Sequence, residues 1–223
     1  MNEVTARATT VTPIVERAMA ANRPIFLWGA PGIGKSELVA GITDSLPGNN
    51  LMIDLRLALM EPTDLRGYPF RNPDTNQMEW SPPVDLPTME QAELYDTIVL
   101  FLDELNSAPP SVQAASYQLI LNGRIGQYEM PSNVRIVAAG NRETDRGVTF
   151  RMPAPLANRF RHINMEVNFL DWQKWAINNS VHPDVIGYLS FAKGDLFDFD
   201  AKSSSQSFAT PRSWTFVSEM LGC

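Results

Sequence analysis

The chain has 223 residues, which is enough for one large α/β domain and part of a second one. Hydrophobic residues make up 44% and charged residues 19%, a balance typical of a soluble protein with a buried core, and no stretch approaches the roughly 20 apolar residues that a membrane span needs. The formal net charge of −7 argues against tight nonspecific binding to nucleic acid, because such binding relies on lysine and arginine to neutralise phosphates.

Cysteine usage and the N-terminus bear on the cellular compartment. The one cysteine, Cys223, cannot form a disulfide within the chain, which fits a reducing cytosol. The first ten residues, MNEVTARATT, contain no apolar run of the secretory type. We therefore expect a cytoplasmic protein.

Strands and helices alternate along the first two thirds of the chain. Residues 12–21 have helical spacing, with Thr12 as a cap and Pro13 at the first helical position. Apolar runs predict five strands, over residues 24–28, 51–57, 97–104, 134–141 and 161–167, with further helices over 36–46 and 111–122. This alternation predicts an α/β fold, a three-layer sandwich with a parallel five-stranded sheet between two layers of helices.

Two segments interrupt the alternation. Residues 61–87 are rich in proline and turn residues and predict a hairpin, with strands at 68–71 and 78–80. A shorter hairpin is predicted at 123–131. After residue 169 the pattern is helical apart from a serine-rich loop at 202–207, so we place a boundary at 167–169, between a domain of residues 1–168 and one of residues 169–223.

The segment GAPGIGKS over residues 29–36 matches the phosphate-loop pattern G-x-x-x-x-G-K-[ST]. It follows a predicted buried strand and precedes a predicted helix, which is the context that the pattern requires. Its backbone N–H groups and the helix N-terminus can bind phosphates, Lys35 can reach the β- and γ-phosphates, and Ser36 can ligate Mg²⁺. The predicted phosphate-binding residues are Gly29, Ala30, Pro31, Gly32, Ile33, Gly34, Lys35 and Ser36.

Polar side chains follow two of the other predicted strands. Asp103 and Glu104 end the apolar run IVLFL, and acidic residues at the carboxyl end of a parallel strand face the ligand crevice. Asp103 is a candidate for the Mg²⁺ shell and Glu104 for orienting the attacking water. Asn141 follows the strand VRIVAAG and could lie between these two motifs, although by itself such a residue is more often a loop asparagine.

These motifs, together with PAPLANRF and TPRSW, occur in the order of an AAA+ ATPase, and the chain resembles that family over nearly its whole length. The segment over residues 61–87 falls where one clade carries an insert in its second helix. The chain is most similar to the MoxR-like group, including its bacteriophage versions, for which the location would be the host cytoplasm.

The resemblance assigns roles by position. It implies that residues 29–36 are Walker A, that Asp103 and Glu104 are Walker B, and that Asn141 is sensor 1. It further implies that Arg159 in ANRF is an arginine finger acting on a neighbouring subunit's nucleotide, with Arg161 as the alternative, and that Arg212 in TPRSW is sensor 2. The resemblance also implies that residues 169–223 are a helical lid, but only eleven residues, SWTFVSEMLGC, follow Arg212. The lid is therefore either minimal or an incomplete part of a longer protein, and we favour the second. Of the roles implied by the resemblance, that of Arg212 as sensor 2 depends most on how complete this lid is.

The resemblance also implies cofactors and partners. It implies ATP and Mg²⁺, a homo-oligomeric and typically hexameric ring, and chaperone-like remodelling of a protein partner, often one with a von Willebrand factor A domain. A nucleic-acid motor and a non-catalytic nucleotide-gated scaffold stay open as alternatives. The acidic charge disfavours the first, and intact Lys35, Asp103 and Glu104 disfavour the second.

The remaining conspicuous side chains indicate packing rather than chemistry. His162 and His182 are far apart with no cysteine nearby, so their spacing is not that of a metal site. Met165, Trp172 and Trp175 have spacings typical of a core. Trp80, in the longer predicted hairpin, is equally compatible with packing and with a partner contact.

Overall fold

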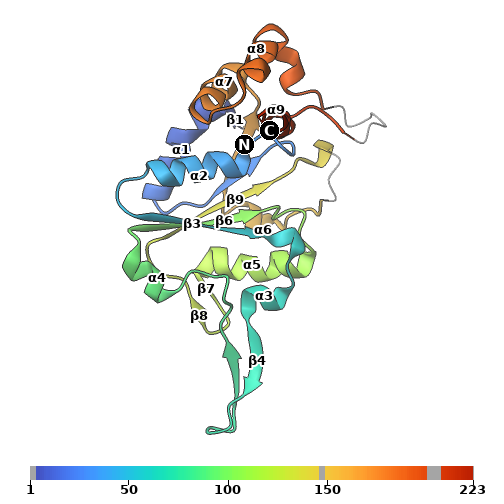
Figure 1. Cartoon of the computed structure of the whole chain (residues 1–223). Coiled ribbons are helices and arrows are strands. Elements are labelled where there is room, and N and C mark those ends of the chain that lie inside the picture. The colour runs from blue at the N-terminus through green and yellow to red at the C-terminus, as the bar shows by residue number, and fades with distance from the viewer. Residues whose placement is uncertain (1–3, 146–148, 200–206, 223) are drawn as a thin grey trace.

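A parallel sheet of six strands runs through the computed structural model, which describes residues 4–145, 149–199 and 207–222 (Figure 1). The strand order is β1-β10-β2-β9-β6-β3. The bounds are β1 Val4–Arg7, β2 Ile25–Trp28, β3 Asn50–Arg56, β6 Thr97–Asp103, β9 Val134–Gly140 and β10 Arg161–Glu166. The predicted serine-rich loop, except for Ser207, and Cys223 lie outside the described residues.

The sheet has one strand more than the five that we predicted. The additional strand, β1, pairs in parallel with β10 at the edge, with Val4 opposite Ile163. The segment VTAR has only two apolar side chains, so its extended conformation comes from this long-range pairing rather than from a local pattern. The other five strands agree with their predicted positions to within one residue at each end.

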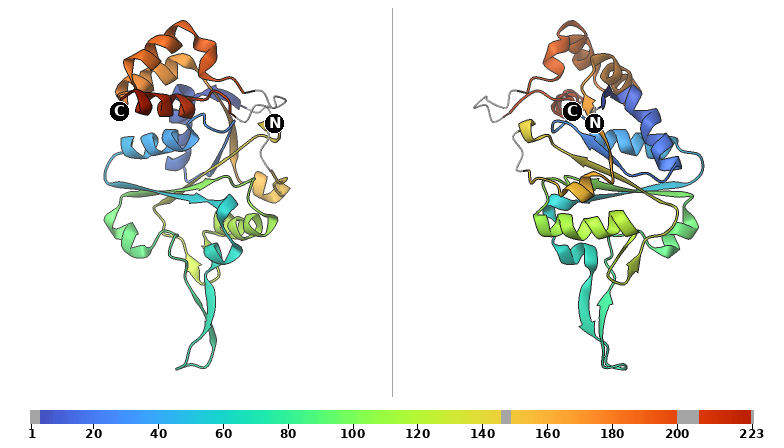
Figure 2. Two further views of the ribbon diagram at one scale, coloured as in Figure 1. Left: turned by 45° about the vertical axis from the view of Figure 1, so that its right-hand side comes forward. Right: turned by 180° about the vertical axis from the view of Figure 1, so that it is seen from behind.

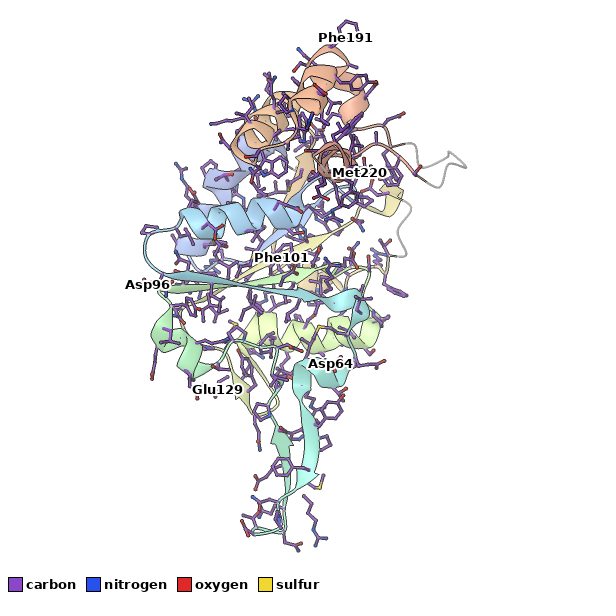
Figure 3. All side chains as sticks on the ribbon, viewed as in Figure 1. Asp64, Asp96, Phe101, Glu129, Phe191 and Met220 are labelled. Atoms are coloured by element: carbon purple, nitrogen blue, oxygen red, sulfur yellow. The ribbon has the colours of Figure 1, made fainter. Side chains whose placement is uncertain are left out.

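Helices cover both faces of the sheet, and β6 shows why the fold needs both layers. Ile98, Leu100 and Leu102 face a hydrophobic cluster that contains residues of α5. Val99 and Phe101 face the opposite cluster, which contains residues of α1 and α2. All five side chains are fully buried, and Phe101 lies in the middle of the molecule (Figure 3). A strand that is apolar on both faces requires cover on both faces.

Three helices of the α/β core, α1, α2 and α5, were predicted, although the first one begins earlier than expected, and the shorter α3, α4 and α6 were not predicted. The bounds are α1 Ala8–Ala20, α2 Lys35–Ser45, α3 Pro62–Arg66, α4 Met89–Leu94, α5 Pro110–Asn122 and α6 Ala154–Ala157. The prediction that Thr12 caps the first helix and that Pro13 occupies its first position was wrong. Pro13 lies inside α1, and the Thr12 hydroxyl donates to the carbonyl of Ala8 one turn earlier.

Both predicted hairpins are present, and the longer one projects from the core (Figures 1 and 2). Strands β4 Tyr68–Arg71 and β5 Met78–Ser81 form the longer hairpin, and β7 Arg124–Ile125 with β8 Tyr128–Glu129 forms the shorter one. Trp80 is half-buried, with the Arg66 guanidinium 4.2 Å from its ring centroid. The Tyr128 hydroxyl donates to the carbonyl of Pro87 and so joins the shorter hairpin to the segment between β5 and α4.

The C-terminal helices pack around a third hydrophobic cluster, at the opposite end of the molecule from the longer hairpin (Figure 2). These helices are α7 Phe169–Asn178, α8 Pro183–Phe191 and α9 Pro211–Leu221. Trp172 is buried in this cluster and Trp175 packs against it, whereas Met165 is buried beneath α1 and α2. All three residues therefore belong to cores, as their spacing indicated. Among the described residues, no helix is long and apolar enough to cross a membrane.

The two-sided packing of β6 predicts a large stability cost for truncation in that strand. Leu100→Ala should lower the free energy of unfolding by about 2–5 kcal/mol, because a fully buried side chain leaves a cavity that its neighbours fill only in part. Leu94→Ala is the matched control, because Leu94 is 69% exposed. Urea denaturation measures both variants, and equal midpoints for the two would contradict the assignment of β6 to the centre of the core.

Candidate functional site

The carboxyl ends of three neighbouring strands meet at one edge of the sheet. Strand β9 lies between β2 and β6, with Trp28 opposite Gly140 and Leu102 opposite Ala138. Because all three strands are parallel, the segments that follow them leave the sheet side by side. The glycine-rich loop, Asn141 and the Asp103–Glu104 pair are therefore brought together from three separate parts of the chain.

The glycine-rich loop joins β2 to the N-terminus of α2. Gly32 and Gly34 have φ angles of +76° and +91°, in the left-handed region that favours glycine. A side chain on Gly32 would also collide with Thr210, so this loop packs directly on the start of α9. The loop thus presents backbone N–H groups at the positive end of a helix dipole, an arrangement suited to binding phosphate.

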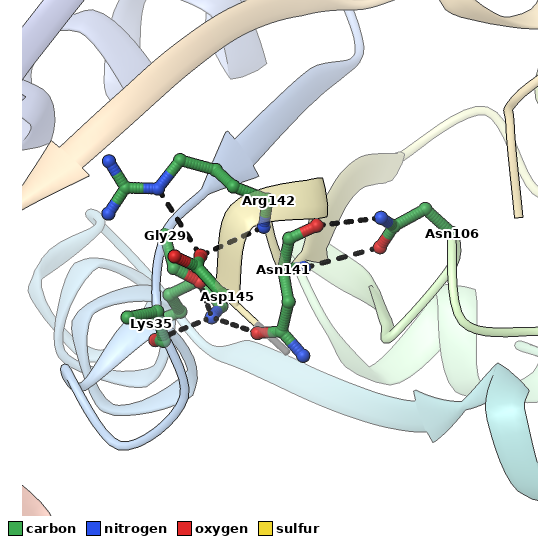
Figure 4. A network of polar contacts seen from close by, with 7 residues as sticks. Gly29, Lys35, Asn106, Asn141, Arg142 and Asp145 are labelled. Atoms are coloured by element: carbon green, nitrogen blue, oxygen red, sulfur yellow. Dashed lines mark hydrogen bonds and ion pairs between the residues drawn. The ribbon is translucent and has the colours of Figure 1, made fainter. Parts of the chain in front are cut away.

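Lys35 lies under this loop with its ammonium group almost out of contact with solvent (Figure 4). Its Nζ donates to the carbonyls of Gly29 and Ala30, at 2.7 and 3.1 Å, and to Oδ1 of Asn141 at 3.1 Å. Burial lowers the pKa of Lys35 from 10.5 to about 8, while the nearby carboxylates of Asp103 and Asp145 act in the opposite direction. Lys35 is therefore a preoriented cation whose charge is sensitive to mildly alkaline pH.

The two acidic residues after β6 occupy a strained turn. Glu104 has a φ angle of +56°, which is uncommon for a residue with a side chain. Its backbone N–H donates to Oδ1 of Asp103 at 2.9 Å, and its carbonyl accepts from Ser107 and Ala108. The turn separates the two carboxylates, so that Asp103 stays aligned with the strand and Glu104 begins the following loop.

The donor set suits a magnesium ion that is shared with a phosphate ligand. Asp54, which we did not predict, lies on the neighbouring strand β3, and burial together with Asp103 raises the pKa of its carboxyl group. Burial is the larger of these causes, and the smaller contribution of Asp103 places the two carboxyl groups near each other. Among the described residues no group of three or more histidine, cysteine or acidic side chains forms a ready-made metal centre. Ser36 and Asp103, which we predicted as ligands, could hold Mg²⁺ together with phosphate oxygens and water, a common arrangement for this ion.

Two further side chains at this edge, those of Asn106 and Asp145, were missed from the sequence. Buried Asn106 bonds to both backbone groups of Asn141, and buried Asp145 accepts from the backbone N–H and Nε of Arg142 (Figure 4). Asparagine and aspartate in loops are usually turn residues, so only the three-dimensional contacts distinguish them. The one feature of the sequence that could have indicated a role for Asn106 is its position two residues after Glu104.

Arg212, at the start of α9, lies beside the glycine-rich loop. Its backbone N–H donates to the carbonyl of Gly32 at 3.2 Å, and its positive charge contributes to the lowered pKa of Lys35. Next to it, a cavity of about 770 Å³ lies between the glycine-rich loop, α2, Trp172 and α9. A volume of this size accommodates a nucleotide-sized ligand.

Arg159 and Arg161 are exposed and stand apart from this cluster. Arg159 follows the short helix α6, and Arg161 begins β10. Neither contributes to the hydrogen bonds of Lys35 among the described contacts. The structure thus brings together Lys35, Asp103, Glu104, Asn141 and Arg212, and leaves Arg159 and Arg161 on the surface.

Comparison with known proteins identifies related sequences and folds. Residues 24–160, more than half of the chain, match the family "AAA domain (dynein-related subfamily)". The chain is 27% identical over 173 residues to midasin from Giardia intestinalis, a match that covers 74% of this chain and 3% of that protein. It therefore spans a small part of this relative's length.

Two solved structures share the fold. One is a Cytophaga hutchinsonii protein described as a "putative ATPase", with a TM-score of 0.50 and 15% identity over 98% of this chain and 59% of that one. The other is NtrX from Brucella abortus, with a TM-score of 0.54 and 14% identity over 95% of this chain and 48% of that one. The chain thus spans about half the length of each.

The lowered pKa of Lys35 predicts a pH-dependent affinity for a phosphate ligand. Phosphate oxygens bind the ammonium form, which predominates below pH 8 and is lost as the pH rises through the pKa of about 8. The Kd for ATP with Mg²⁺ should therefore increase above pH 8, at a limiting slope of about tenfold per pH unit for the loss of one proton. Calorimetry between pH 7 and 9.5 measures this slope, and a constant Kd over that range would contradict the assignment.

Proposed function

We propose that this chain, which belongs to the dynein-related subfamily of AAA domains, binds ATP with Mg²⁺ and hydrolyses it. The observation that supports this most strongly is the buried Lys35 ammonium, held under the glycine-rich loop beside the acidic end of β6. A buried cation next to free helix N–H groups and a carboxylate pair is suited to a triphosphate and its metal ion.

Each residue of the cluster has a part in the proposed reaction. The loop N–H groups and Lys35 would hold the β- and γ-phosphates, and phosphate oxygens would replace some of the present acceptors of Lys35. Ser36 and Asp103 would hold Mg²⁺, which when bound neutralises charge on the phosphate oxygens. Glu104 would orient and polarise the attacking water, and Asn141, already bonded to Lys35, would lie next to the γ-phosphate.

The cavity beside Arg212 is our candidate for the nucleoside end of ATP. It begins at Gly32 and Gly34, continues along α2 and ends against Trp172 and α9. The hydrogen bond between Arg212 and Gly32 links this cavity to the phosphate loop. Nucleotide binding at the loop would therefore affect the position of residues 169–223 through Arg212. We treat those residues as a helical lid on a core of residues 1–168.

Arg159 supports a ring in which neighbouring subunits complete each other's sites. An exposed arginine outside its own Lys35 cluster is available to a neighbouring molecule, and a cation supplied in trans can stabilise the charge that develops during phosphoryl transfer. We infer a homo-oligomer, with six subunits as the working number.

Within this family we favour a MoxR-like role, in which ATP hydrolysis remodels a protein partner. The hairpin of β4 and β5 supports a role in partner contact, because it projects away from the core and exposes Tyr68, Phe70 and Met78. A partner with a von Willebrand factor A domain is our first choice. Stimulation of ATP hydrolysis by DNA, with none by such a protein, would instead favour a nucleic-acid motor.

Replacement of Glu104 separates binding from chemistry. Glu104→Gln keeps the size and polarity of the side chain but loses the carboxylate, so it should bind ATP normally and hydrolyse it at least ~100-fold more slowly. Phosphate release and calorimetry measure the two steps. Glu129→Gln, at an exposed position on β8, is the matched control and should behave like the parent. Parental turnover in Glu104→Gln would mean that another group orients the water.

Mixing two inactive variants tests the contribution of Arg159 in trans. Arg159→Ala should bind ATP and lose about 10³-fold or more in turnover. Mixed with Glu104→Gln, it should regain part of the activity, because some interfaces then pair an intact Glu104 with an intact Arg159. Arg161→Ala is the matched comparison and should keep its activity. Absence of complementation after demonstrated subunit exchange, or full activity in a dilute monomer, would exclude a finger in trans.

A further inference from the structure

Asn106 forms a two-point clamp on the backbone of Asn141. Its Nδ2 donates to the Asn141 carbonyl at 2.7 Å, and its Oδ1 accepts from the Asn141 N–H at 3.2 Å. The side chain of Asn106 is almost completely buried. An amide of this length carries a donor and an acceptor on one planar group, so it can pair with both polar groups of a single backbone residue.

The surroundings of Asn106 are shaped to keep it there. A side chain on Gly140 would overlap the Asn106 amide and the ring of Phe26, so β9 has room for this clamp only with glycine at that position. The backbone carbonyl of Asn106 accepts from Phe150, and the N–H of Leu105 continues the pairing with β9 by donating to Ala139. Asn106 is therefore held by its own backbone as well as by its side chain.

The clamp connects the two strand ends that carry the polar residues. Asn106 lies two residues after Glu104, in the turn that follows β6, whereas Asn141 follows β9. The side chain of Asn141 in turn accepts from Lys35 Nζ. A continuous series of contacts thus runs from the turn containing Glu104 through Asn106 and Asn141 to Lys35 (Figure 4).

We propose that Asn106 is a positioning residue for ATP hydrolysis, which holds Asn141 at a fixed distance from both Lys35 and Glu104. This inference rests on the proposed function, since it assumes that Asn141 lies next to the γ-phosphate. Asn106 itself touches no reacting group. It acts through the backbone of Asn141, and small displacements of a group at a reacting centre reduce turnover strongly.

The test compares Asn106→Ala with a matched control at the other end of β9. Asn133 precedes this strand and also donates two side-chain hydrogen bonds to backbone carbonyls, those of Ala92 and Tyr95. Asn133→Ala should therefore lose a similar amount of stability and keep its turnover. Asn106→Ala should lower kcat by about 10–100-fold while the Kd for ATP stays near that of the parent, because Lys35 keeps its two loop carbonyls.

A double-variant cycle distinguishes positioning from general destabilisation. If Asn106 acts through Asn141, then Asn106→Ala combined with Asn141→Ala should have the kcat of Asn141→Ala alone. Asn106→Asp is the second variant should the alanine variant fold poorly, because it keeps the acceptor for the Asn141 N–H and loses the donor. Its kcat should also fall.

The outcomes separate this inference from the proposed function. Normal kcat in Asn106→Ala, or multiplicative losses in the double variant, would overturn the positioning role while ATP hydrolysis stands. A parent chain that hydrolyses no ATP would overturn the proposed function and with it the role of Asn106 in turnover.

Discussion

The buried positive charge of Lys35 is the interaction on which the rest of the site depends. Lowering its pKa from 10.5 to about 8 corresponds to about 3 kcal/mol against the charged form. The carboxylates of Asp103 and Asp145 act in the opposite direction, and two loop carbonyls and the Asn141 side chain accept hydrogen bonds from the ammonium group. These contacts form only if the glycine-rich loop and the end of β9 keep their positions. The strand order meets this requirement, because it places β9 between β2 and β6. A ligand with several negative charges next to Lys35 would favour the charged ammonium form and raise its pKa again.

The longer hairpin, with its exposed Tyr68, Phe70 and Met78, lies away from the cluster around the glycine-rich loop. Helices α7, α8 and α9 lie on the side of α1 and α2, whereas the hairpin of β4 and β5 projects from the side of α5 (Figures 1 and 2). Tyr128, in the shorter hairpin, donates to the carbonyl of Pro87 in the segment between β5 and α4. A partner that contacts the hairpin would bind at a distance from the candidate nucleotide site.

Much of this arrangement could be predicted from the sequence, because its causes are local. The runs IFLW and TIVLFL are too apolar to lie anywhere but in a sheet covered on both faces, and the loop GAPGIGKS follows the first of them directly. The features that were missed depend on distant residues. Strand β1 exists through its pairing with β10, and Asn106 is distinguished from an ordinary turn residue only by its contacts with Asn141, 35 positions away. Helix α1 begins before Pro13, and there the Thr9 N–H and hydroxyl donate to Asp171, in α7. That contact could not be predicted locally.

The most direct measurement is a calorimetric titration of ATP with Mg²⁺ into the parent chain, Lys35→Ala and Lys174→Ala at pH 7. Lys174 is an exposed lysine on α7 and controls for the loss of one positive charge. We expect saturable binding to the parent and to Lys174→Ala, and an affinity at least about 100-fold weaker for Lys35→Ala, because charge-assisted contacts with two phosphates are lost. Equal affinity in all three proteins would contradict the account, since the buried ammonium would then have no part in holding the nucleotide.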